Sequence, residues 1–145
     1  MDEFSDIKQV MALAKKRHPK IRAFYEDDHN WMNNGLDALK AAQPMLAENT
    51  FQKLILAQPD HCDGYEGYAR VCFATGRLRS AQTLMDHAHS LAKASADLGE
   101  TDPEIVQEMD DFRREIDSAL KNQQEKSPRT IADAGACNQA IKVRV

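Results

Sequence analysis

Few residues in this chain could carry chemistry. His61, Cys62 and Asp63 are consecutive and offer an imidazole, a thiol and a carboxylate, which can bind a metal or form a nucleophile–base pair. They are adjacent, however, and lack the C-x₂-C spacing of zinc sites, while His87 and His89 would point in different directions on a helix. Phosphate-loop, dinucleotide, G-x-S-x-G and H-E-x-x-H motifs do not occur. We therefore predict no enzyme, no bound metal and no cofactor.

Composition narrows the function classes. The chain has 145 residues, a formal net charge of −4 and 42% hydrophobic residues, which suits one domain with a core. Nucleic-acid-binding domains usually carry a basic face, and a membrane helix needs about 18 apolar residues in a row, so we expect neither a nucleic-acid nor a membrane partner. The three cysteines give no disulfide framework. Because the acidic N-terminus lacks the features of a secretory signal, we predict a cytoplasmic protein.

The organisation of the chain follows from a step of 34 residues. Trp31 and Tyr65 are this far apart, and small or apolar residues recur at the same step after them. The matched pairs are Gly35 with Ala69, Ala38 with Cys72, Ala47 with Ala81, Phe51 with Met85 and Leu54 with Ala88. Such a step is typical of stacked helix pairs, in which small residues let two helices cross closely. We predict an all-α fold, an antiparallel helix-hairpin array with helices over 29–42, 45–58, 62–75 and 78–97.

Each predicted helix pair needs a tight turn between its two helices. In the second pair Gly76 can take the positive φ that commonly ends a helix. The first pair has Ala42 there, followed by Gln43 and Pro44. Since proline is tolerated at a helix start and disfavours helix in the residue before it, this sequence also predicts a turn.

An amphipathic helix is predicted before the array, over 2–17. Its apolar face consists of Phe4, Ile7, Met11 and Ala14. The basic run 15–18 falls in the last turn, and Pro19 ends the helix. We interpret this run as complementing the helix dipole rather than as a nucleic-acid or membrane patch, because it is short and acidic residues flank it.

A second amphipathic helix is predicted after the array, over 102–123. It starts at a capping box over 101–104 or at Asp102 before Pro103, and its apolar stripe consists of Ile105, Met109, Phe112, Ile116 and Leu120. A repeat array needs an end helix of this kind, although the stripe could instead be an exposed interface. The sequence thus predicts one domain over 1–123, with repeats at about 28–61 and 62–95, N-terminal and C-terminal capping helices, and a flexible tail over 124–145.

The two units resemble the tetratricopeptide repeat (TPR). The first has the W-x-x-x-G spacing from Trp31 and closes at Pro59, and the second has Y-x-x-Y-A followed by the turn at Gly76. The resemblance implies a non-enzymatic protein-interaction module whose groove is lined by the first helix of each pair. We predict that a peptide or helix of a partner protein contacts the residues at those positions, which include Met32, Leu36, Leu39, Lys40, Glu66, Arg70 and Phe73.

Several alternatives stay open. The apolar residues of that groove could pack against the flanking helices of the same chain. Residues 103–109 resemble the helix that ends small TPR-type chaperones of bacterial type III secretion, although a third repeat is not seen. A structural subunit that oligomerises, for example as a homodimer, is another alternative. A metal-binding protein or a Cys/His enzyme is the least favoured one.

Overall fold

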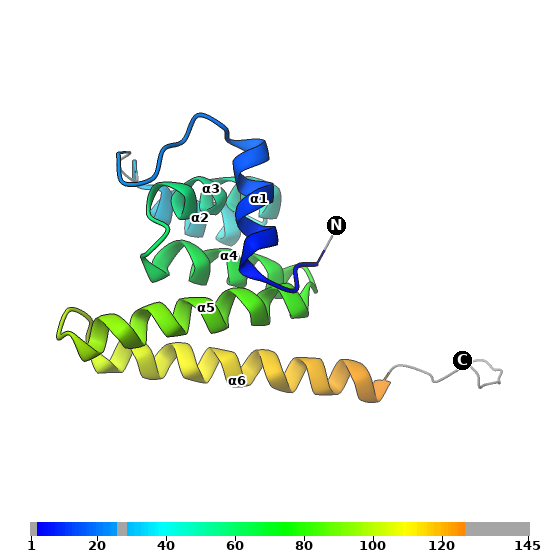
Figure 1. Cartoon of the computed structure of the whole chain (residues 1–145). Helices are drawn as coiled ribbons and strands as arrows, with labels where there is room; N and C mark the ends of the chain where they lie inside the picture. Colours follow the sequence, from blue (N-terminus) through cyan, green and yellow to red (C-terminus); the bar gives the residue numbers. More distant parts are fainter. Residues whose placement is uncertain (1–2, 26–28, 127–145) are drawn as a thin grey trace.

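The computed structural model describes residues 3–25 and 29–126, and in this part of the chain the regular structure is entirely α-helical (Figure 1). The six helices described are α1 (Ile7–Arg17), α2 (Trp31–Lys40), α3 (Pro44–Ala57), α4 (Cys62–Ala74), α5 (Leu78–Asp97) and α6 (Pro103–Lys126). The predicted all-α class is confirmed. Most of the predicted flexible tail lies outside the described residues, but 124–126 belong to the last turn of α6.

Helices α2 to α5 form two helix hairpins, as the 34-residue step predicts. The first unit is α2 with α3, the second unit is α4 with α5, and α3 packs on α4 to join them. The bounds of α5 are those predicted. Helix α2 is shorter than predicted at both ends, because Asn30 is its N-cap and Ala41 and Ala42 already belong to the turn.

The two turns adopt the same backbone conformation with different residues. Gly76 has the expected positive φ of 79°, and Ala42 has a φ of 58° at the matching place. Pro44 follows as the first residue of α3, as predicted. An L-residue with a side chain is strained in this left-handed region by roughly 1–2 kcal/mol, whereas glycine is not. The first unit therefore contains strain that the second unit lacks.

The core of the array is centred on Phe51 of α3, which is fully buried. A Cβ atom added to Gly35 of α2 would lie 2.5 Å from Cζ of Phe51, and one added to Gly67 of α4 would lie 2.2 Å from its Cε1. The Phe51 ring thus occupies the space that two glycines leave. The predicted close crossings are also present, since Ala47, Ala69, Ala81 and Ala88 are completely buried.

The N-terminal helix differs from the prediction in its start and in its place. Helix α1 begins at Ile7, with the side chain of Asp6 accepting a hydrogen bond from the Gln9 N–H. Phe4 precedes the helix and is buried, with its backbone N–H donating to Ser80 Oγ at 2.6 Å. Helix α1 packs across α3 and α5 rather than stacking on α2 at the end of the array (Figure 1).

The C-terminal helix α6 packs along α5. Met109, Phe112 and Ile116 of its apolar stripe are buried, so this part of the stripe is internal packing rather than an open interface. The helix starts at Pro103, and Asp102 Oδ1 accepts from the Glu104 N–H. The capping box over 101–104 is not formed, because the Thr101 hydroxyl donates to Ser95 Oγ instead.

Candidate protein-binding surface

The seven residues predicted to bind a partner lie on α2 and α4, which are neighbours in the array. Met32, Leu36 and Leu39 of α2 are partly buried against the core and keep part of their surface exposed. Lys40 is exposed at the end of the same helix. These four residues form a short apolar strip with a cation at one end, which we call the α2 strip.

The residues on α4 are more strongly engaged by the chain itself. Arg70 forms an i,i+4 ion pair with Glu66, with 2.8 Å between Nη2 and Oε2. The Arg70 guanidinium also lies over the Phe112 ring of α6, 4.6 Å from its centroid. Phe73 meets the same ring edge-to-face at a centroid distance of 5.4 Å. The alternative that a flanking helix packs against the predicted groove thus applies to Arg70 and Phe73.

Close helix packing brings the two halves of this surface together. Gly35 and Gly67 allow α2 and α4 to approach the Phe51 ring, as described above. Gly64, one turn earlier on α4, is equally confined, because an added Cβ would lie 2.7 Å from Cγ2 of Ile55. The sequence-based predictions did not include Gly64 and Gly67. Their i,i+3 spacing on one helix was the signal that could have found them.

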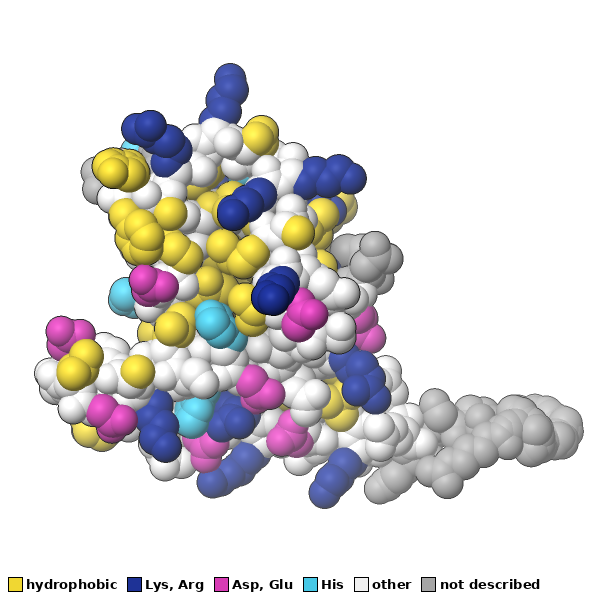
Figure 2. Space-filling view, viewed as in Figure 1, with side chains coloured by type: hydrophobic (Ala, Val, Ile, Leu, Met, Phe, Trp, Pro, Cys, Tyr) yellow, Lys and Arg dark blue, Asp and Glu magenta, His cyan; other side chains and the backbone are white. Residues whose placement is uncertain are grey.

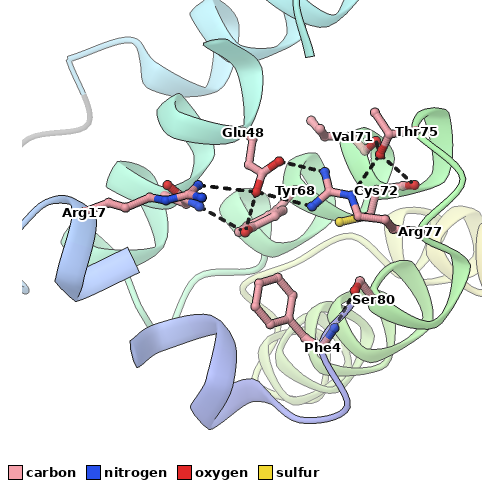
Figure 3. Close-up of polar contacts among 10 residues, drawn as sticks. Phe4, Arg17, Glu48, Tyr68, Val71, Cys72, Thr75, Arg77 and Ser80 are labelled. Carbon is pink, nitrogen blue, oxygen red and sulfur yellow. Dashed lines mark hydrogen bonds and ion pairs between the residues drawn. The ribbon is translucent and has the colours of Figure 1, made fainter. Parts of the chain in front are cut away.

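A second polar cluster, also missed, is buried where α1, α3, α4 and α5 meet (Figure 3). Glu48 Oε1 accepts from Arg77 Nη2 at 2.7 Å, and both side chains are 7% exposed. The Tyr68 hydroxyl donates to Glu48 Oε2 at 3.1 Å and accepts from Gln52 Nε2 at the same distance. Arg17 of α1 reaches Glu48 Oε2 at 3.7 Å from its exposed position. We call this group the Glu48–Arg77 cluster.

The pKa shifts in the Glu48–Arg77 cluster agree with a fastening role. Burial, and next the negative charge of Glu48, raise the pKa of the Tyr68 hydroxyl well above its ordinary value, so it stays protonated as a donor. Burial alone would lower the pKa of Arg77, but its hydrogen bond to Glu48 outweighs this, and the net pKa is raised. A permanent cation thus neutralises a buried carboxylate, and no group of this cluster is poised for proton transfer near neutral pH.

The His61–Cys62–Asp63 triplet forms the N-terminus of α4. Its three donor atoms lie within 4.8 Å of one another, close enough to hold a metal ion. However, His61 Nδ1 already accepts from the Asp63 N–H at 3.2 Å, which caps the helix. Burial, with the charges of Asp63 and Glu66, raises the pKa of the Cys62 thiol to about 11. The thiol is therefore protonated at neutral pH and is a poor nucleophile.

Comparison with known proteins adds no identification. Neither a protein-family model, nor a curated protein, nor a solved structure matches this chain. In the part of the chain that the structure describes, none of the helices is long and apolar enough to cross a membrane. The likeness to the TPR therefore depends on the residues quoted above alone.

Proposed function

We propose that this chain is a non-enzymatic protein-interaction module that holds an apolar helix or extended segment of a partner against α2 and the adjoining face of α4. The observation that carries the proposal is the α2 strip. Its three apolar side chains keep exposed surface, while α2 packs mainly on α3 and α4. The weaker alternative of a Cys/His enzyme is disfavoured by the protonated state of Cys62.

The surroundings of the strip suggest the chemistry of the partner. Apolar side chains spaced i, i+4 and i+7 along α2 suit the apolar face of an amphipathic helix. Lys40 offers a cation at one end, so an acidic residue of the partner would fit there. Because Phe112 of α6 engages Arg70 and Phe73, we place the main contacts on α2 rather than on α4. We infer a cytoplasmic location from the sequence, with Cys62 and Cys72 both free thiols.

A display selection tests this proposal, because it requires no named partner. A library of helical peptides is selected on the full chain, and the enriched peptides are tested on Met32→Glu/Leu36→Glu. We expect enriched peptides with apolar residues at helical spacing, and at least about a tenfold loss of affinity in the variant, since apolar anchors dominate such interfaces.

The matched control is Glu108→Ala, because Glu108 is exposed on α6 away from the strip. Arg113 would be a poor control, since it forms ion pairs with Asp86 and Asp110. Circular dichroism confirms that each variant is folded. Enriched peptides that bind the double variant as tightly as the unaltered chain would move the binding surface off α2.

A further inference from the structure

A strongly basic surface lies at the end of the molecule where α1 leads into the following loop. Lys15 and Lys16 are exposed in the last turn of α1, and Lys20 and Arg22 are exposed in the loop. Lys53 of α3 is close enough to His18 to lower its pKa, so it belongs to the same surface. Figure 2 shows Lys and Arg side chains around the upper end of this face, with hydrophobic side chains between them.

These five cations are not neutralised by the described part of the fold. Within residues 3–25 and 29–126, none of them forms an ion pair, whereas the arginines of α6 are paired with Asp86, Asp110 and Asp111. A cluster of this kind is unusual on a chain with a net charge of −4. The helix dipole explains Lys15 and Lys16 but not Lys20, Arg22 or Lys53, which lie outside the last turn of α1.

Two aromatic side chains are displayed beside these cations. Phe24 is 70% exposed and Tyr25 is 81% exposed, and the Arg22 guanidinium lies 5.2 Å from the Tyr25 ring centroid. Phe24 has a φ of 66°, a strained conformation for a residue with a side chain, and its N–H donates to the Ala57 carbonyl at 2.9 Å. The backbone therefore holds an exposed phenylalanine in place at a cost that no burial of its side chain offsets.

From this surface we infer that the α1–α2 loop docks the protein on an anionic lipid bilayer, with Phe24 and Tyr25 entering the headgroup region and the five cations facing acidic headgroups. The loop forms the outer edge of the molecule (Figure 1), and a convex edge fits a flat bilayer better than it fits a peptide, which needs a groove. Exposed aromatics beside lysines are the usual elements of interfacial binding. This revises the expectation that the basic run serves the helix dipole alone.

The attraction should be moderate and sensitive to salt. Residues 26–28 are Glu-Asp-Asp in the sequence and lie outside the described residues. Their charge opposes that of the cations at long range, so binding should weaken steeply as ionic strength rises. The proposed partner surface on α2 is separate from this loop, and the two proposals can fail independently.

Vesicle flotation of the full chain tests the inference. Vesicles of equal parts phosphatidylserine and phosphatidylcholine should carry the protein at low salt, and vesicles of phosphatidylcholine alone should not. Lys15→Gln/Lys16→Gln/Lys20→Gln should weaken binding by about tenfold to a hundredfold, because each cation near such a surface contributes appreciably. Phe24→Ala/Tyr25→Ala should weaken it by about tenfold, because the buried apolar area is lost.

Matched controls lie elsewhere on the surface. Lys93→Gln/Lys121→Gln removes two exposed cations of α5 and α6, and Leu98→Ala removes an apolar side chain that is 75% exposed. Both controls should bind as the unaltered chain does. Absence of binding to the anionic vesicles, or equal binding by all variants, would overturn the inference. So would binding to single-stranded oligonucleotides, but not vesicles, that only the loop variants lose, since this would make the surface a nucleic-acid site.

Discussion

The first and second helix hairpins match each other at a step of 34 residues, yet they are used differently. The second unit, α4 with α5, is covered by α3 on one side, by α6 on the other and by α1 across α5. The first unit, α2 with α3, has α1 across α3 only, and its helix α2 keeps the partly exposed apolar strip. Even the two turns differ, with unstrained Gly76 in one and strained Ala42 in the other.

The difference shows how one repeated pattern can support two tasks. Packing on all sides makes the second unit the fastening point of the chain, and the Glu48–Arg77 cluster ties the first unit to it. Surfaces that bind partners tend to lie in the less stable parts of a protein. We therefore expect the first unit to open more readily than the second. The predictions below test this comparison, beginning with the largest expected effect.

The ion pair between the two units should give the largest effect. Arg77→Leu leaves Glu48 buried without its cation, which should lower the free energy of unfolding by about 3–5 kcal/mol. Urea unfolding measures the change. Glu48→Leu/Arg77→Leu should recover much of the loss, because two apolar side chains leave no buried charge. A double variant as unstable as Arg77→Leu would show that the side chains fasten the units by shape rather than by charge.

The space around Phe51 should give the next largest effect. Gly67→Ala places a methyl group 2.2 Å from the Phe51 ring, and overpacking of this kind costs about 1–3 kcal/mol. Gly35→Ala should cost less, since its Cβ would lie 2.5 Å away and α2 is free to shift outward. Thermal unfolding compares both with Asn33→Ala, an exposed position on α2. Equal losses at the two glycines would mean that the first unit is as tightly held as the second.

Exchanging the turn residues should give a smaller effect of opposite sign in the two units. Ala42→Gly relieves a strained φ of 58° and should stabilise the fold by up to about 1 kcal/mol. Gly76→Ala should destabilise it by about 1 kcal/mol, since an added Cβ contacts nothing within 4 Å and only the φ of 79° opposes it. Chemical unfolding of both variants measures the pair. Destabilisation by Ala42→Gly would show that Ala42 is not strained.

The smallest effect should be a dependence on pH. Burial lowers the pKa of His18, only partly offset by its hydrogen bond to Gln52, and the charges of Lys53 and Arg17 lower it further. A folded-state pKa below the unfolded value of about 6.5 means that the unfolded chain binds the proton more readily, so stability is lost as pH falls below about 6.5. His18→Gln should lose less stability than the unaltered chain between about pH 7.5 and about pH 5.5 in urea melts.

Asn33→Ala, which has no titratable group, is the control for that slope. The histidines His87 and His89 also have pKa values lowered chiefly by burial, so some dependence on pH should remain in His18→Gln. An unchanged slope in His18→Gln would assign the whole effect to those two residues on α5.

Much of the fold could be predicted because it depends on neighbours along the chain. The apolar spacing within each helix predicted α3 and α4 to within one residue at each end and α5 with its observed bounds. The placement of α1 could not be predicted in this way. It depends on Phe4 meeting Ser80 and Tyr68, and nothing near Phe4 in the sequence indicates those partners.

The candidate site was predictable only as a set of positions. The step of 34 residues placed Leu36 and Arg70 on equivalent faces, but it could not show that Phe112 engages one of them. Glu48 was missed for a similar reason. A glutamate among apolar residues of α3 is explained only by Arg77, which lies 29 residues further along the chain.

The anchoring of the N-terminal segment has a consequence for how the protein is made. Glu3 Oε1 accepts from the backbone N–H groups of Arg79 and Ser80, and the Thr83 hydroxyl donates to the Phe4 carbonyl. Helix α1 is therefore made before α5, and its docking surface is incomplete until α5 has followed it out of the ribosome. At about 5–20 residues per second, this is a delay of several seconds. During that time its apolar face is open to any chaperone near the tunnel exit.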